Sequence, residues 1–151
     1  ITGEIKGLGD DTIYLYGIDG LYQHIDTIYV KGDKFSHSLK VDTITTAMLL
    51  LKGETEYPIF LDKKEKIKVQ GNANNLDHLN IEGNIYNEEF SAFQATLQGP
   101  GIPSEKMLEA KAEEFIRQHN NSFVSIYLLD KYFVQKKGAY YESRINSSLL
   151  Q

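Results

Sequence analysis

Two histidines and an aspartate lie close together in the segment HIDTIYVKGDKFSHSLKV, residues 24–41, and these residue types can bind a metal ion or transfer a proton. Imidazole nitrogens and carboxylate oxygens are common ligands of zinc and related ions. If the first part of the segment is a strand, His24 and Asp26 share one face, because side chains alternate between the two faces. His37 could join them if the chain folds back on itself.

The same segment also has the pattern of a β-hairpin. Every second side chain of the second strand lies on the same face of that strand: Phe35, His37, Leu39 and Val41. Gly32, in the KGD that separates the two strands, can adopt the positive φ of a tight turn. We favour a hairpin with a half-buried histidine, because two histidines and one acid without a defined ligand motif are common by chance.

Other reactive groups do not form a recognisable catalytic pattern. The chain has no cysteine, which excludes thiolate chemistry, disulfides and cysteine-ligated metals within these residues. The glycines of GEIKGLGDD, residues 3–11, lack the spacing of a nucleotide-binding loop, and no serine lies in a nucleophile elbow. We therefore expect no catalytic residue, no cofactor and no metal, and a small hydrolase or metalloenzyme is the weakest alternative.

Composition limits the partners that this chain can have. Its 151 residues suit one domain, or one domain with an appended helical segment, and 41% hydrophobic residues suffice for a core. The net charge of −5 provides no basic face, so we do not expect a nucleic-acid partner. The longest apolar run, TAMLLL, is too short to cross a bilayer, and no signal peptide is visible.

The hydrophobic pattern divides the chain into a β-rich part and a helical part. Up to about Gly83 the period is near two, with turns rich in Gly, Asp and Asn. The expected strands are residues 1–7, 12–18, 22–31, 34–41, 46–52, 57–62, 65–71 and 78–83. This pattern predicts an α+β protein with an antiparallel β-sandwich or curled sheet of about eight strands, followed by a C-terminal helical segment.

From Ile85 onward the pattern becomes helical. A helix over residues 85–98 should bury one face, formed by Ile85, Phe90, Phe93 and Leu97. After a break at GPGIP, Ser104 can cap a second helix, and Ser122 can cap a third over residues 123–137. The second helix should present a stripe formed by Leu108, Ala112, Phe115 and His119. We expect a β-rich domain over residues 1–98 and a helical segment over residues 99–151.

Aromatic residues in both parts are candidate contact sites. The third helix is apolar on almost its whole circumference, so another body should cover the side that this chain leaves open. That body would be a missing neighbour or a second copy. Tyrosines on the first strands could bind a sugar or a protein. The residues that we expect to contact a partner are Tyr14, Tyr16, Phe123, Tyr127 and Phe133.

The order of several short motifs resembles a known family. GEIKGLGDDTIYLY, HIDTIYVKGDKFSHS, YPIFLDKKEKIKVQGN and LNIEGNIYNEEFSAF are similar to the domain of unknown function that precedes thioredoxin-like domains of the alkyl hydroperoxide reductase and thiol-specific antioxidant type. Such proteins are envelope lipoproteins of certain Gram-negative bacteria. The matching positions are Gly3 and Gly7, Asp26-Thr27, residues 30–35, Asp62, and Gly83-Asn84 with Asn87. NNSFVSIYLLDKYF resembles the helix that commonly follows, where a proline often replaces Asn121.

The resemblance implies where this chain acts. It implies a periplasmic or cell-envelope protein, anchored through a lipid-bearing cysteine that is not among these residues, with the redox cysteine pair in a downstream domain. We expect the chain, which opens at Ile1, to be a piece of a longer protein.

The resemblance also implies a non-catalytic role. The expected function is that of an accessory domain of a thiol–disulfide oxidoreductase, which positions the catalytic domain or recognises its client. The expected partners are that downstream domain, a client protein or a second copy. A stand-alone module that binds glycan or peptide through the tyrosine-rich strands is the alternative.

Overall fold

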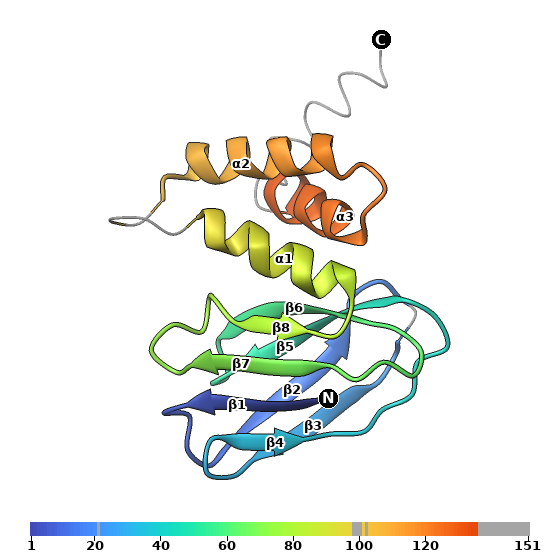
Figure 1. Ribbon diagram of the computed structural model, residues 1–151, viewed down its shortest axis with the longest axis vertical. Helices are drawn as coiled ribbons and strands as arrows, with labels where there is room; N and C mark the ends of the chain where they lie inside the picture. The colour runs from blue at the N-terminus through green and yellow to red at the C-terminus, as the bar shows by residue number, and fades with distance from the viewer. Residues whose placement is uncertain (21, 98–100, 102, 136–151) are drawn as a thin grey trace. The chain divides into compact units, whose positions relative to one another are not determined.

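The computed structural model of the chain describes residues 1–20, 22–97, 101 and 103–135 (Figure 1). The chain forms two compact units, Ile1–Ala92 and Phe93–Gln151, and the change from one to the other falls within the first helix. The predicted boundary between residues 98 and 99 lies outside the described residues.

The first unit contains two four-stranded sheets, so the described residues hold eight strands and confirm the predicted fold class (Figure 1). One sheet has the order β4-β1-β7-β8 and the other β3-β2-β5-β6. The strands are β1 (Thr2–Lys6), β2 (Asp11–Gly17), β3 (Ile25–Val30), β4 (Lys34–Ser36), β5 (Thr45–Leu51), β6 (Thr55–Leu61), β7 (Lys68–Asn72) and β8 (Asn80–Glu82). All pairings are antiparallel except that of β1 with β7, which is parallel.

Alternation along the strands builds the core between the two sheets. In β2, Ile13 and Leu15 are buried, while Tyr14 between them is exposed. From the other sheet, Ile5 and Val69 are also fully buried. Each such side chain contributes about 1.5–3 kcal/mol when it is removed from water, which is why this period-two pattern is a reliable signal of the strands.

The predicted hairpin forms only at its turn. Lys31 and Lys34 exchange backbone hydrogen bonds of 2.9 and 3.1 Å, and Gly32 and Asp33 both have positive φ, as a tight two-residue turn requires. Beyond this point the predicted ladder is wrong: β3 pairs with β2, and β4 pairs with β1 in the other sheet. The two strands separate because each finds a longer partner in its own sheet, and β4 ends at Ser36 instead of extending to Val41.

The first helix, α1 (Ile85–Thr96), begins by covering the outer edge of β6. The Asn87 side chain accepts a hydrogen bond from Phe60 N–H and donates one to Phe60 C=O, both at 2.8 Å. Asn84 also donates to Phe60 C=O at 2.8 Å and caps the helix by accepting from Asn87 N–H. The expectation that Ile85 is buried is wrong, since it is 63% exposed and the polar Asn87 occupies the buried face instead.

The second unit contains α2 (Glu105–Gln118), α3 (Phe123–Leu129) and a π-helical stretch, η1 (Asp130–Gln135). The Ser104 and Ser122 side chains cap α2 and α3 by accepting hydrogen bonds from Met107 N–H and Val124 N–H, which confirms both predicted caps. The predicted third helix is α-helical only from Phe123 to Leu129, and the π-helical stretch η1 follows it. The predicted end of this helix at residue 137 lies outside the described residues. Within this unit the Phe93 and Phe115 rings meet edge to face at 5.5 Å.

The Asn87 contact gives a direct test of how the β6 edge is held. The change Asn87→Ala should lower the free energy of unfolding by about 2–3 kcal/mol, because it leaves the buried Phe60 N–H without a partner. Urea unfolding followed by circular dichroism measures the change. Glu88→Gln, on the exposed side of the same helical turn, is the matched control and should stay within about 0.5 kcal/mol of the parent. Equal stability of the Asn87→Ala variant would contradict this role.

Candidate functional site

Three polar side chains meet where β3 begins. Asp26 accepts a hydrogen bond from the Tyr22 hydroxyl at 2.6 Å on one carboxylate oxygen, and its other oxygen lies 2.7 Å from His37 Nε2. β3 positions Asp26, while His37 lies just beyond the end of β4. We call Tyr22, Asp26 and His37 the clasp, because they connect β3 to the segment that follows β4 at a place where no backbone ladder joins the two.

The clasp changes the ionisation of two of its members. Burial alone would raise the pKa of Asp26, but the hydrogen bonds from Tyr22 and His37 outweigh it and hold this pKa below its usual value. The charge of His24 acts in the same direction on the pKa of Asp26. Burial, followed by the hydrogen bond to Asp26, raises the pKa of Tyr22 above its usual value. Asp26 is therefore an ionised acceptor, and Tyr22 is a neutral donor.

The metal-binding alternative required His24, Asp26 and His37 to converge. Asp26 and His37 do meet, and both side chains are about four-fifths buried, with exposed fractions of 18% and 22%. His24 instead packs edge to face against the Tyr22 ring, with the centroids 5.4 Å apart. Within the part of the chain that the structure describes, no three His, Cys, Asp or Glu residues are placed to hold a metal ion. His37 is partly buried, as the hairpin interpretation predicts, but the hairpin ladder around it does not form.

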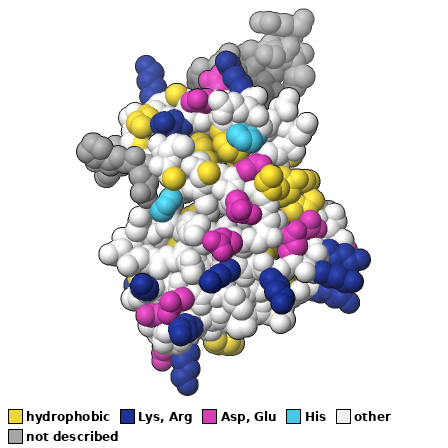
Figure 2. Space-filling view, in the orientation of Figure 1, with side chains coloured by type: hydrophobic (Ala, Val, Ile, Leu, Met, Phe, Trp, Pro, Cys, Tyr) yellow, Lys and Arg dark blue, Asp and Glu magenta, His cyan; other side chains and the backbone are white. Residues whose placement is uncertain are grey.

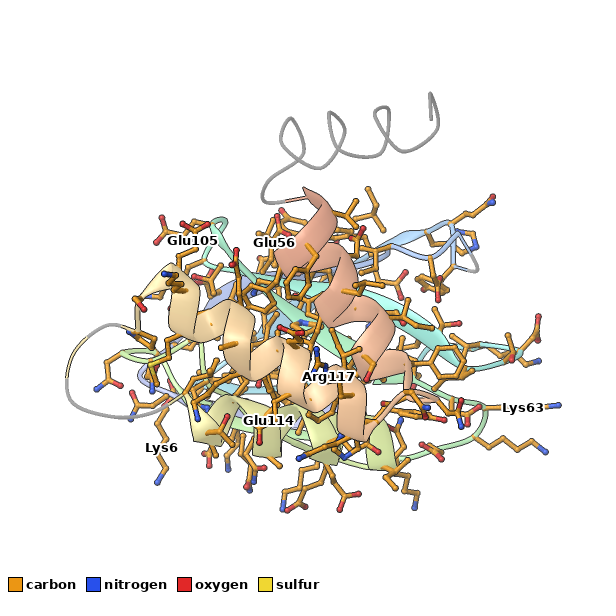
Figure 3. The ribbon with its side chains drawn as sticks, turned by 90° about the horizontal axis from the view of Figure 1, so that it is seen from above. Lys6, Glu56, Lys63, Glu105, Glu114 and Arg117 are labelled. Atoms are coloured by element: carbon orange, nitrogen blue, oxygen red, sulfur yellow. The ribbon has the colours of Figure 1, made fainter. Side chains whose placement is uncertain are left out.

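A pocket of about 320 Å³ lies beside the clasp. Residues 37–42 form one wall, and the connection from β6 to β7 forms another, with Leu61 and Ile67 at its apolar base. The pocket lining includes acidic and basic side chains, and neither charge sign predominates: Lys40, Asp42, Asp62, Lys63, Lys64 and Glu65. Lys63 extends outward from the connection (Figure 3). Such a mixed rim selects no single ligand class by charge.

Tyr22 is a part of this region that its residue type and position do not reveal on their own. It belongs to the tyrosines of the first strands, for which the sequence predicts only contact with a sugar or a protein, yet its hydroxyl donates a hydrogen bond to Asp26. The sequence signal for this contact is weak: a tyrosine stands four residues before an acid. This spacing indicates a hydrogen bond only if the chain bends before β3. Gly17 shows that bend, because a Cβ on Gly17 would collide with the Tyr22 carbonyl oxygen.

Several positions of the family motifs have structural tasks in the first unit. Gly3 lies under the Phe35 ring, where a Cβ would clash. Asp62 accepts a hydrogen bond from Lys63 N–H at 2.7 Å, which shapes the turn after β6. Gly83 has a φ of 140°, and a Cβ there would meet the backbone of Ile67 at 2.9 Å. These positions therefore specify turns and close contacts of the fold.

Tyr14 and Tyr16, expected to contact a partner, lie on the outer face of the β3-β2-β5-β6 sheet. Tyr14 is 40% exposed, and Tyr16 is half-buried. Burial, together with the charge and hydrogen bond of Glu56, raises the pKa of Tyr16. Both phenol rings are accessible in part, so this face can offer aromatic contact area.

The other three expected contact residues lie in the second unit and differ in exposure. Phe123 and Phe133 are half-buried, whereas Tyr127 is buried and lies under the Lys131 ammonium group, 5.9 Å from its ring centroid. Large apolar side chains nearby are more open: Ile126, Leu129 and Val134. These three residues contribute most of the accessible apolar surface of α3 and η1.

Charged groups of both signs are interspersed on the face shown in Figure 2. On α2, Arg117 pairs with Glu113 at 2.5 Å, one helical turn apart, and both side chains are exposed. Exposed pairs of this kind contribute about 0.5 kcal/mol or less. Among the described helices, none has the length and apolar character needed to span a membrane.

The lowered pKa of Asp26 predicts a specific response to acid. Because the pKa is lower in the folded than in the unfolded chain, the ionised carboxylate stabilises the fold above the unfolded pKa. This stabilisation is lost as pH falls through the folded pKa. Asp26→Asn should therefore lose less stability than the parent between about pH 7 and about pH 3, as measured by thermal unfolding. The exposed Asp42→Asn is the control, and an Asp26→Asn profile parallel to the parent would contradict the expectation.

Comparison with known proteins gives one match. No curated protein and no solved structure matches the chain. The sequence model of the family described as "Domain of unknown function (DUF4369)" matches residues 1–90, which include both sheets and the beginning of α1. This match covers more than half of the chain. On the strength of that match, the chain belongs to the DUF4369 family of domains of unknown function.

Proposed function

We propose that this chain is the non-catalytic N-terminal accessory domain of a thiol–disulfide oxidoreductase of the bacterial envelope, lipid-anchored in the intact protein, where it positions the catalytic domain or recognises its client. The observation that carries the proposal is the apolar surface of α3 and η1. Ile126 is 63% exposed, Leu129 49% and Val134 47%. Ile126 and Leu129 are three residues apart and therefore lie on one side of α3.

This surface is suited to a stable neighbour. Val124, Tyr127 and Leu128 on the other side of α3 are buried, so the helix already has one apolar contact within its unit. Burying the exposed Ile126 and Leu129 would contribute about 1 kcal/mol each. A covalently linked domain would need little additional binding free energy to stay docked on this surface, since its effective concentration is high.

The chemistry assigned to the neighbour is one that this chain cannot supply. Thiol–disulfide exchange needs a thiolate that attacks a disulfide sulfur, and the chain has no cysteine. In the proposed protein a Cys-x-x-Cys pair in the downstream domain performs the exchange. The DUF4369 part contributes a rigid two-sheet body, and the helical part contributes the docking surface.

The first test is the coding sequence beyond Gln151, where we expect a thioredoxin-like domain with a Cys-x-x-Cys pair. The longer protein should reduce insulin disulfides, and the chain alone should not. A downstream sequence without a cysteine pair would contradict the proposal.

The second test is hydrogen exchange of α3 in the longer protein and in the chain alone. The longer protein should protect α3 more strongly, and Leu129→Ser should remove at least part of that difference. Glu114→Ser, an exposed position on α2, is the control and should leave the protection unchanged. Equal exchange of α3 in both proteins would contradict docking at this surface even if the cysteine pair is present.

A stand-alone module that binds glycan or peptide is a second candidate, favoured by Tyr14 and Tyr16 on the outer face of one sheet. Aromatic side chains supply large contact areas at small cost in conformational entropy. On this alternative, Tyr14→Ala should weaken binding of an oligosaccharide or peptide about tenfold, measured by calorimetry. Tyr86→Ala, on α1 outside this face, is the comparison variant. Unchanged affinity after Tyr14→Ala would exclude this face as the binding site.

A further inference from the structure

β1 begins between two neighbours, and both neighbouring segments extend past its first residue (Figure 1). On the β4 side, the nitrogen of Ile1 donates to His37 C=O and His37 N–H donates to Ile1 C=O, both at 2.8 Å. On the β7 side, Thr2 N–H donates to Ile67 C=O at 2.9 Å. The chain therefore continues on each side of the line of β1 beyond the point where β1 starts.

The pocket beside the clasp lies on this line. Ile1 is part of its lining, together with residues 37–42 on the β4 side and with residues 62–65 and Ile67, which lead into β7. Its two walls are thus the continuations of the two strands that flank β1 in the sheet. The pocket, of about 320 Å³, has the position that a further stretch of β1 would occupy.

Backbone groups in both walls lack partners. Within the residues that the structure describes, residues 38–42 make no hydrogen bond, although Leu39 and Val41 are half-buried in the alternating manner of a strand. Ile67 is only 4% exposed, and among the described residues no group accepts a hydrogen bond from its N–H. Buried backbone groups in proteins are nearly always paired, so both walls are suited to an extended segment between them.

The register of β1 determines which groups would face such a segment. Ile1 and His37 exchange two hydrogen bonds, and in an antiparallel ladder every second residue faces the partner strand. The N–H and C=O groups of Leu39 and Val41 therefore face the line of β1. A segment in line with β1 would place its second residue before Ile1 opposite Leu39 and its fourth opposite Val41. Continuing the parallel pairing with β7, the residue directly before Ile1 would accept a hydrogen bond from Ile67 N–H.

We propose that, in the intact lipid-anchored protein, the segment directly before Ile1 continues β1 through this pocket and pairs with residues 38–41 and with Ile67. This pairing rests on the proposed function, in which an anchored segment precedes these residues. A segment joined to Ile1 starts inside the pocket, so its effective concentration at both walls is high. Its second residue before Ile1 should be apolar or aromatic, because that side chain shares the sheet face of the buried Ile5 and meets the apolar base at Leu61.

The clasp gives this site a fixed wall. His37 is the residue at which the wall begins, and its imidazole lies 2.7 Å from the Asp26 carboxylate of the other sheet. The wall that receives the anchored segment is thereby connected to both sheets. A peptide from another molecule would have to displace a segment that is already covalently held there, and the mixed charges of the rim provide no compensating attraction.

Hydrogen exchange followed by NMR tests the proposal on two forms of the protein. One form begins at Ile1, and the other carries at least the four residues that precede Ile1 in the intact protein. The longer form should slow exchange of the Leu39 and Val41 amides at least about tenfold, because each amide gains a hydrogen bond. The Ser38 and Lys40 amides face away from β1 and are internal controls, which should exchange equally in both forms.

Thermal unfolding gives a second measurement. The preceding residues should raise the unfolding temperature, and Leu39→Pro should remove at least half of that rise, because proline has no N–H to donate. Lys40→Pro is the matched control and should retain the rise, since the Lys40 N–H faces away from β1. If a proline variant does not fold, the exchange comparison still decides between the outcomes.

Four results would overturn the proposal. One is equal exchange of the Leu39 and Val41 amides in the two forms, and another is a coding sequence in which no segment precedes Ile1. Protection that the form beginning at Ile1 gains only at high concentration would assign the pocket to a second copy. Protection that appears only when another protein is added would assign it to a client. A missing downstream cysteine pair would contradict the accessory role and leave the protection of Leu39 unchanged, so the two failures are distinguishable.

Discussion

Asn87 satisfies both backbone groups of Phe60 at the outer edge of β6, and the need to satisfy such groups governs much of this structure. A buried N–H or C=O without a partner costs about 1–3 kcal/mol, comparable with the burial of an apolar side chain. At β6 the partner is a carboxamide on α1, which gains its own position from the Asn84 cap. The helix that follows the sheets is thus fixed to them by polar contacts as well as by Phe90, which packs against the Tyr57 ring.

The same requirement explains the seam between β3 and β4, which is the boundary beyond the Lys31–Lys34 turn where the two strands belong to different sheets. A two-residue turn connects the strands, yet each completes its ladder in a different sheet, so the seam lacks backbone bonds beyond the Lys31–Lys34 pair. The clasp of Tyr22, Asp26 and His37 crosses it with side-chain bonds. An imidazole and a carboxylate that could have served metal binding or proton transfer are here engaged with each other and with a phenol. That engagement accounts for the lowered pKa of Asp26.

The surfaces that these contacts leave accessible are the candidate contact surfaces for other molecules. In the first unit this is the tyrosine face of the β3-β2-β5-β6 sheet, and in the second unit the exposed side of α3 and η1. The proposed accessory role uses the helical surface.

Sequence alone determined the elements, because their signals are local. Period-two alternation located all eight strands to within a few residues, except that β4 is much shorter than expected, and Ser104 and Ser122 marked two helix starts through their own hydroxyl groups. Tertiary structure decided what pairs with what. The parallel pairing of β1 with β7, the separation of β3 from β4, and the burial of Asn87 in place of Ile85 depend on partners far away in the chain. The clasp belongs to the same class, since Tyr22, Asp26 and His37 become neighbours only after the two sheets have formed, and no local pattern encodes a contact whose geometry depends on both.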